Sequence, residues 1–350
     1  MTPEAEPGAA HDRLQDGIEE GFSKTEINGD ALQEISRAAE WNSSVDNAPI
    51  AIDPELSRPA SIEASAYLDP TIPESTIERP RWPRLTPHLG HTLLFFAITI
   101  FVLAVSQLLG VLLLEQTHLF GHRSFQAIFR LSADDARLSI PVQAFSYALV
   151  AIVVIPSFGL LWREKFSDGV HWGGATARRR FLLLAAAGLA CGFGIGAFGS
   201  FLPMPKDPPI MQDMMRSPVG AWMMLIFGIT AAPLLEELAF RGFLLPGLVN
   251  SFRWFGHRRM ISDRAVRWLG IPLSIFITSA GFALMHSPQV SHAWGPLVLI
   301  GMVSVVLCIV RLTLNSVAAG AVVHAAYNFT LFAGVLFQTG GFRHLDKLTT

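Results

Sequence analysis

From residue 90 onward the chain alternates between long apolar stretches and short polar loops. A helix of about 20 apolar residues crosses the hydrocarbon core of a bilayer. Five stretches have about this length, at 90–114, 139–162, 181–203, 219–235, which runs on into Glu236-Glu237, and 315–337. Two shorter neighbouring stretches add spans at 271–287 and 295–311, and 248–268 is a candidate for an eighth. The pattern therefore predicts an all-α fold, a polytopic transmembrane helix bundle of about 7–8 spans.

The first part of the chain has a different composition. Residues 1–82 contain 17 of the 28 acidic residues but only six of the 26 basic ones, and they are rich in proline and serine. Such a segment buries too little apolar surface to offset the entropy of folding. We therefore predict that residues 1–85 form a disordered N-terminal extension. The start of the chain lacks the basic and apolar parts of a signal peptide, so we expect the first span to act as the targeting signal.

Composition and charge support a membrane location. Hydrophobic residues make up 51% of the chain and charged residues only 15%, which is low for a soluble protein. If the N-terminus is cytoplasmic, 14 Lys and Arg residues lie on the inner side, mainly in loops 163–180 and 253–267 and including Arg311, against seven outside. The positive-inside rule then predicts an inner (cytoplasmic) membrane protein with a cytoplasmic N-terminus. The lipid bilayer is the expected partner, and no nucleic-acid-binding signature is present.

Three apolar stretches in the last third of the chain carry polar residues. They are Glu236–Arg241, Phe282–His286 and His324–Asn328. A charged side chain in hydrocarbon costs a few kcal/mol, so such residues usually face the interior of a bundle and mark a site. The three stretches together predict a polar pocket inside the membrane.

Helical spacing separates two roles within the first stretch. Glu237 and Arg241 are four residues apart and are predicted to form a structural pair. Glu236 points about 100° away from Glu237 and is free to project into the pocket as a general base. The same spacing puts two further pairs on one helix face each: Phe282 with His286, and His324 with Asn328.

Each residue alone also has a plain structural interpretation. A single histidine in a span usually makes an interhelical hydrogen bond, a Glu–Arg pair can be a buried ion pair, and an asparagine can hold two helices together. The expected boundaries also leave His286 near the outer end of its span, whereas Glu236 and His324 lie toward the cytoplasmic side. The case for a site rests on the three stretches occurring together.

The combination of motifs resembles a known family. Glu-Glu-x-x-x-Arg, Phe-x-x-x-His and His-x-x-x-Asn follow one another on successive apolar segments, as in the CAAX proteases and bacteriocin-processing enzymes. This CPBP family is also called the Abi or type II CAAX prenyl endopeptidase family. The resemblance covers about 219–330 and divides the chain into the extension 1–85, N-terminal transmembrane helices at 86–205, a catalytic transmembrane core at 206–338 and a tail at 339–350.

The resemblance implies an intramembrane endopeptidase. It assigns Glu236 as the catalytic glutamate, with His286 helping it to activate water. His324 and Asn328 would stabilise the oxyanion, and the supporting residues would be Glu237, Arg241 and Phe282. Zinc is a candidate cofactor, because Glu236, His286 and His324 could supply three ligands. The His-Glu-x-x-His spacing of zinc proteases is absent from the sequence, however, and direct activation of water is the equal alternative.

Two classes of function remain open from the sequence. The first is a peptidase that acts on a membrane-associated or lipidated peptide or protein. The second is a non-catalytic membrane scaffold, or a bacteriocin-immunity protein, with the same fold. Loss of cleavage on replacing Glu236, in a chain that still accumulates in the membrane, would separate the two. The identity of the substrate is not encoded in any of the three motifs.

Overall fold

The computed structural model describes residues 86–118, 121–205 and 217–348. The described residues belong to one compact unit, Trp82–Thr350. The predicted disorder of residues 1–85 lies outside the described residues. Side chains are described for all of these residues except 132–134 and 347–348.

The described part of the chain forms helices and no strand, which confirms the all-α prediction. The first half contains α2 (Leu89–Thr117), α3 (Phe125–Asp134), α4 (Ala136–Trp162), α5 (Phe166–Gly169), α6 (Gly174–Arg179) and α7 (Phe181–Gly199). The second half contains α9 (Pro218–Ile229), α10 (Ala231–Glu237), η3 (Leu238–Leu244), α11 (Leu245–His257), α12 (Asp263–Ala265), η4 (Val266–Gly270), α13 (Ile271–Met285), η5 (Ser287–Val290), α14 (Trp294–Leu314), α15 (Val317–Gln338) and η6 (Leu345–Leu348).

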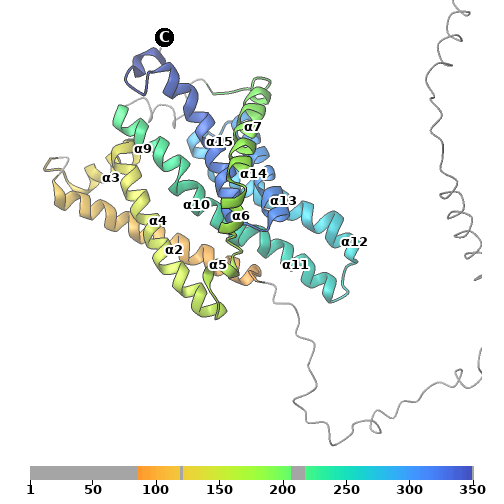
Figure 1. Cartoon of the computed structure of the whole chain (residues 1–350). Helices are drawn as coiled ribbons and strands as arrows, with labels where there is room; N and C mark the ends of the chain where they lie inside the picture. Colours follow the sequence, from red (N-terminus) through yellow and green to blue (C-terminus); the bar gives the residue numbers. More distant parts are fainter. Residues whose placement is uncertain (1–85, 119–120, 206–216, 349–350) are drawn as a thin grey trace, which may run out of the picture. The chain divides into compact units, whose positions relative to one another are not determined.

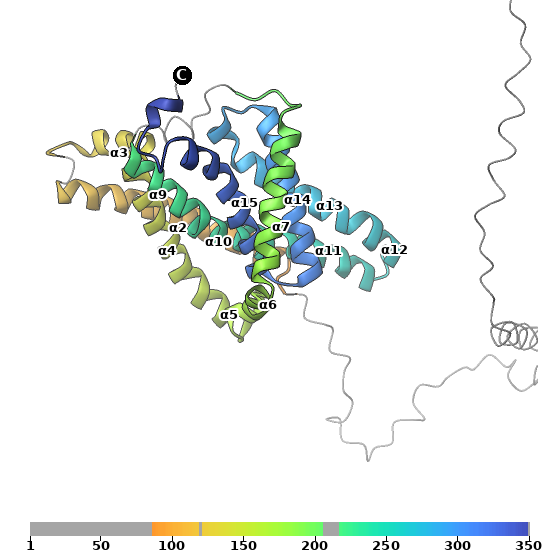
Figure 2. The ribbon, with the colours of Figure 1, turned by 45° about the horizontal axis from the view of Figure 1, so that its top comes forward.

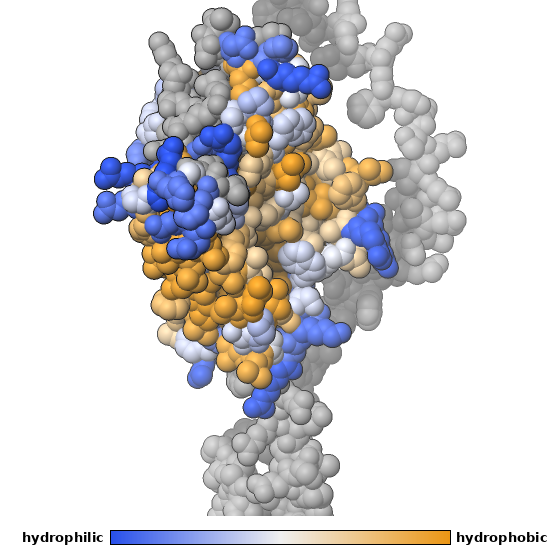
Figure 3. Space-filling model, turned by 90° about the vertical axis from the view of Figure 1, so that its left-hand side faces the viewer, coloured by the Kyte–Doolittle hydropathy of each residue, from blue (hydrophilic) through white to orange (hydrophobic). Residues whose placement is uncertain are grey.

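Seven helical runs of the described chain are long and apolar enough to cross a membrane. They are Leu89–Thr117, Ala136–Trp162, Phe181–Gly199, Pro218–His257, Asp263–Met285, Trp294–Leu314 and Val317–Gln338. Large apolar side chains on these runs are exposed: Leu160 and Leu182 are each 81% accessible. Figure 3 shows a broad apolar surface with hydrophilic residues gathered toward its two ends. Such a surface is stable only against lipid. The chain is therefore a multi-pass membrane protein.

The candidate eighth span at 248–268 is not a separate helix. Its first half is the end of α11, which continues α9 and α10 in one helical run of 40 residues from Pro218 to His257. After a turn, its second half is η4, which leads directly into α13. Figure 1 shows α9, α10 and α11 following one another along a single line. Hydropathy alone does not reveal that two short apolar stretches belong to longer helices on either side of a turn.

The long run from Pro218 to His257 has two local irregularities. At Thr230, between α9 and α10, the backbone leaves the helical region (φ −125°, ψ −86°). From Leu238 to Leu244 the chain forms a π-helix, η3, and Pro246 follows two residues after its end. Proline lacks an N–H group and so leaves carbonyls of the preceding turn without a helical donor. Glu236 lies between the two irregularities.

Close packing fixes the helices around this run. Glycines of α7 face α15, where a Cβ on Gly188 would clash with the Val323 backbone and one on Gly192 with Thr330. Small residues of this kind let membrane helices approach closely. Figure 2 shows α7 beside α15 and α14. On the other side of the run, the Phe243 ring of η3 stacks on Phe95 of α2, with 4.1 Å between ring centroids.

The loop before α6 ties down the start of α15. The backbone N–H of Val317 donates to the carbonyl of His171 (3.1 Å), and that of Ala318 donates to the carbonyl of Trp172 (2.9 Å). The hydroxyl of Ser316 donates to the carbonyls of Trp172 and Gly173. The first turn of α15 is thus held by a segment more than a hundred residues earlier in the chain. His324 lies two turns along this helix.

Candidate active site

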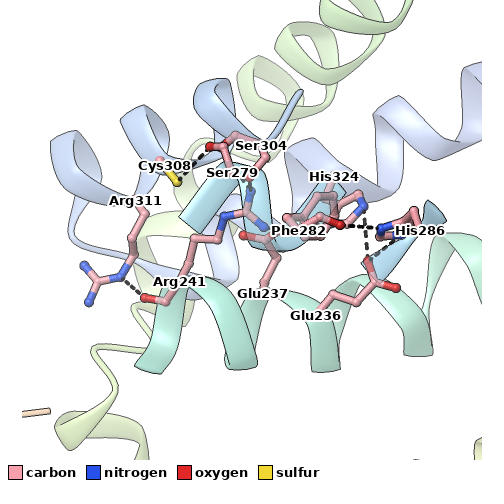
Figure 4. A network of polar contacts seen from close by, with 10 residues as sticks. All are labelled: Glu236, Glu237, Arg241, Ser279, Phe282, His286, Ser304, Cys308, Arg311 and His324. Atoms are coloured by element: carbon pink, nitrogen blue, oxygen red, sulfur yellow. Dashed lines mark hydrogen bonds and ion pairs between the residues drawn. The ribbon is translucent and has the colours of Figure 1, made fainter. Parts of the chain in front are cut away.

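Glu236, His286 and His324 come together from three helices. Glu236 lies near the end of α10, His286 directly follows α13, and His324 belongs to α15. One carboxylate oxygen of Glu236, Oε2, lies 3.6 Å from Nε2 of His324 and 3.9 Å from Nε2 of His286. Figure 4 shows both rings directed at this oxygen. The predicted convergence of these three residues is present in the structure.

The span boundaries expected from hydropathy left His286 and Glu236 at different depths, and these boundaries were wrong. The first span was expected to run from 219 only into the Glu236-Glu237 motif, and the second to begin at 271. In the structure Glu236 lies well inside the helical run Pro218–His257, and the run before His286 begins at Asp263. Because both helices are longer than the apolar stretches, the end of α13 reaches the level of Glu236.

Hydrogen bonds fix which ring nitrogen of each histidine faces Glu236. Nδ1 of His286 lies 2.8 Å from the carbonyl oxygen of Phe282, which can only accept, so Nδ1 carries the hydrogen. Nδ1 of His324 lies 3.0 Å from Oε1 of Glu237 and donates to that carboxylate. Each neutral ring therefore presents the lone pair of its Nε2 to Glu236. Three acceptor atoms face one another, an arrangement that needs a proton, a water molecule or a cation between them.

Glu237 and Arg241 form a fully buried ion pair beside this site. Nη1 of Arg241 donates to Oε1 of Glu237 at 2.9 Å, and both side chains have no exposed surface. Nη2 of Arg241 donates to the hydroxyl and to the backbone carbonyl of Ser304 on α14. The other carboxylate oxygen of Glu237 has no hydrogen-bond partner among the described residues, and a Cβ on Gly320 would lie 2.7 Å from it. The pairing predicted from the four-residue spacing is present.

Phe282 packs between the ion pair and the histidines. The guanidinium carbon of Arg241 lies 4.7 Å from the centre of the Phe282 ring, a cation–π distance. The same ring lies 4.7 Å from His286 and 5.6 Å from His324, measured between ring centroids. Phe282 therefore packs against Arg241 of the ion pair and against both histidines.

The side chain of Asn328, a further predicted site residue, bonds to a different helix. Its Nδ2 donates to the carbonyl oxygen of Gly228 in α9 at 2.7 Å. Gly228 lies just before the break at Thr230, where helical hydrogen bonding is interrupted. Asn328 follows His324 by one helical turn, and its amide has a second N–H group that this bond does not use.

The donor atoms suit zinc in kind. Two imidazole nitrogens and a carboxylate oxygen are ligands of catalytic zinc, and histidines bound to metals usually donate their other N–H as His286 and His324 do. As the described side chains stand, however, no group of three or more His, Cys, Asp or Glu residues among them is arranged to hold a metal ion. We therefore derive no chemical step through a metal.

Two residues of the network were not among those predicted. Ser304 receives both bonds of the Arg241 Nη2 group, and Arg311 of α14 donates from Nε to the backbone carbonyl of Arg241 at 3.0 Å. The positive-inside count takes Arg311 only as a cytoplasmic-side cation, yet its side chain is 4% exposed inside α14. An arginine close to apolar residues was the available signal. Nothing in the sequence distinguishes Ser304 from other serines in spans.

Comparison with known families gives one match. The family model described as "Type II CAAX prenyl endopeptidase Rce1-like" matches residues 218–330. The resemblance predicted from the motifs is confirmed. The Rce1-like segment begins at the first residue of α9 and contains all three motifs, while α2, α4 and α7 lie outside it. It covers about a third of the chain. No curated protein and no solved structure matches the chain.

Proposed function

We propose that the protein is an intramembrane endopeptidase that hydrolyses a peptide bond in a membrane-associated or lipidated peptide or protein. The observation that carries the proposal is the convergence of the Glu236 carboxylate with the Nε2 atoms of His286 and His324. The Rce1-like match supports the same class, because its description names an endopeptidase. Placing a carboxylate and two imidazoles inside a membrane costs free energy, and a catalytic role accounts for their presence there.

Glu236 and His286 activate the attacking water in this proposal. Their facing acceptor atoms lie 3.9 Å apart, a distance at which one water molecule can donate a hydrogen bond to each. The water oxygen attacks the scissile carbonyl carbon while its proton passes to the Glu236 carboxylate. The protonated Glu236 then delivers this proton to the leaving amine nitrogen, so the carboxylate is regenerated and one water is consumed.

His324 and Asn328 stabilise the negative charge that forms on the carbonyl oxygen. The unused N–H group of the Asn328 amide is one donor, and His324 acts when its Nε2 carries a proton. Glu237 accepts the Nδ1 hydrogen of His324 and so fixes the orientation of its ring. Arg241 holds Glu237 in turn, and Phe282 packs against both histidines.

We further propose an inner-membrane location with a cytoplasmic N-terminus. The basic loops 163–180 and 253–267 would then lie on the cytoplasmic side, as the positive-inside rule requires. Substrate would enter from the bilayer or from its surface. Accessibility of an N-terminal tag to a protease in spheroplasts and in inverted vesicles tests the orientation, and digestion only in inverted vesicles is the expected result.

The test of the function uses purified protein in detergent and a quenched lipopeptide library. Wild type, Glu236→Ala and His324→Ala are compared with and without a metal chelator, and His292→Ala serves as the control for an exposed histidine outside the site. We expect cleavage by wild type and control, its loss in both site variants, and no effect of the chelator. Inhibition by the chelator would argue against direct activation of water, and would favour a mechanism with zinc bound to Glu236, His286 and His324. Folded wild type that cleaves nothing in the library would contradict the proposal and favour a scaffold or immunity role.

A further inference from the structure

Arg311 is a buried cation to which the proposed mechanism assigns no role. It is 4% exposed, and among the described residues no carboxylate forms an ion pair with it. Its three donors reach three different places: Nε donates to the Arg241 carbonyl, Nη1 to Oδ1 of Asn315 at 2.6 Å, and Nη2 to the Val170 carbonyl. Burying an arginine is costly, so these contacts need a reason.

Pro246 explains the contact between Nε of Arg311 and the Arg241 carbonyl. In η3 the N–H of Leu245 donates to the carbonyl of Phe240, five residues earlier. The next residue, Pro246, stands five residues after Arg241 and has no N–H group to continue this pattern. The Arg241 carbonyl therefore lacks a helical donor in a buried region, and Nε of Arg311 occupies that place at 3.0 Å.

The rescued carbonyl belongs to the residue that orients the site. The Arg241 guanidinium donates to Glu237 at 2.9 Å, Glu237 accepts from His324 at 3.0 Å, and His324 faces Glu236 at 3.6 Å. A shift of η3 would move the first member of this chain and turn the His324 ring. Figure 4 shows Arg311 at the far end of the network from His286.

We propose that Arg311 is a positioning residue of the peptidase site, which supplies the hydrogen-bond donor that Pro246 withholds and thereby holds η3 and the Arg241–Glu237–His324 chain in place. The inference rests on the proposed function for its kinetic consequence. It gives a role to α14 and to the loop at Val170, which lies outside the Rce1-like segment. An arginine is required because three donors with fixed directions reach three acceptors, whereas lysine offers a single nitrogen.

The experiment restores a backbone N–H donor at position 246 for the Arg241 carbonyl. Arg311→Met and Arg311→Lys are each made alone and with Pro246→Ala, which returns an N–H group five residues after Arg241. We expect Arg311→Met to lower kcat about 10²-fold at unchanged KM, because the reacting groups are misplaced. Arg311→Lys loses less. Adding Pro246→Ala to Arg311→Met should raise kcat about tenfold, after correction for the effect of Pro246→Ala alone. A change of this size corresponds to the net contribution of one hydrogen bond. Arg264→Met, on the exposed α12, is the control and should match wild type.

Two kinetic outcomes overturn the inference: wild-type kcat in both Arg311 variants, or no recovery on adding Pro246→Ala. If Arg311→Met does not fold, the Lys variant with and without Pro246→Ala decides. Hydrogen exchange of the amides in 238–247 is measured in the same proteins, and it should be faster in the Arg311 variants and slower again with Pro246→Ala. This readout does not need peptidase activity. If wild type cleaves nothing, the proposed function fails, and unchanged exchange would separately overturn the anchoring of η3 by Arg311.

Discussion

Two adjacent glutamates on one helix stand in opposite surroundings. Around Glu237 opposite charges meet: its carboxylate accepts from Arg241 and from His324, and neither side chain of the ion pair is exposed. Around Glu236 acceptors meet acceptors, and the side chains of Glu236 and His286 keep 14% and 16% of their surface. In the first region the buried charges are paired without a ligand. The second region needs a proton, a water molecule or a cation between its acceptors, which is the condition for chemistry.

The comparison shows how one helix separates support from reaction. A turn of about 100° between neighbouring residues sends two identical side chains into different environments. Removal of the supporting carboxylate should therefore be felt first in stability. Removal of the reacting carboxylate should be felt in rate alone.

The largest expected effect is on the reacting side. Glu236→Gln keeps the size of the side chain but removes the base, so we expect cleavage to fall by about 10²–10⁴-fold. The unfolding temperature should stay at the wild-type value, because Glu236 accepts no hydrogen bond from another side chain among the contacts described. Single-turnover cleavage and thermal unfolding in the same detergent measure the two quantities. A variant that cleaves at the wild-type rate would remove Glu236 from the mechanism.

The supporting side should respond with stability. Arg241→Met leaves the Glu237 charge buried without its partner, and breaking a buried pair in this way costs about 3–5 kcal/mol. The unfolding midpoint in denaturant should drop accordingly, with Arg264→Met as the exposed control. An unchanged midpoint would mean that the ion pair contributes nothing to the fold.

His324 contacts both Glu236 and Glu237, so we expect its replacement to have an intermediate effect on cleavage. His324→Gln loses the group that faces Glu236 and the proposed oxyanion, so we expect a fall of about 10²–10³-fold in kcat. His292→Gln, in the exposed turn after α13, should leave kcat unchanged. Equal losses in the two variants would argue against a specific role of His324.

A smaller effect is expected from Gly320. A Cβ at this position would lie 2.7 Å from Oε2 of Glu237, and overpacking of this kind costs about 1–3 kcal/mol. Gly334→Ala is the matched control on the same helix, since a Cβ there meets nothing within 4 Å. Thermal unfolding should separate the two variants. Equal unfolding temperatures would show that Glu237 has room to move.

The smallest effect concerns pH and the loop that holds α15. Burial, and then the charge of nearby Arg311, lower the pKa of His171 below its usual 6.5. The unfolded chain then binds a proton near pH 6 that the folded chain does not, so stability falls as the pH drops below about 6.5. His171→Asn removes the titrating imidazole and should flatten this dependence of stability on pH. Asn is chosen because it tolerates the left-handed backbone at this position (φ 54°). Unfolding temperatures at about pH 7.5 and about pH 5.5 test it, and equal shifts in variant and wild type would contradict it.

Local spacing predicted the parts of the site that lie within one helix. Four residues bring side chains to the same face whatever the rest of the fold does, and Glu237 and Arg241 are accordingly paired. The same rule put His324 and Asn328 on one face. It does not say which neighbouring helix each one meets, and Asn328 meets Gly228 rather than Glu236.

Tertiary features lay beyond the sequence pattern. Hydropathy carried the span from 219 only into the Glu236-Glu237 motif, whereas the helical run continues to His257. The positive-inside count takes Arg311 as a cytoplasmic-side cation, and only the structure shows that it lies opposite the Arg241 carbonyl freed by Pro246. Seven spans and the three motifs follow from apolar length and residue spacing, but the depth of each motif depends on where long helices bend and stop.

The most direct test is a matched pair of substitutions at adjacent positions. Cleavage rate and unfolding temperature are measured together for wild type, Glu236→Gln and Glu237→Gln. The account predicts that Glu236→Gln loses cleavage at an unchanged unfolding temperature, whereas Glu237→Gln lowers the unfolding temperature by leaving Arg241 as an unpaired buried cation. Wild-type cleavage by folded Glu236→Gln would contradict the account at its centre.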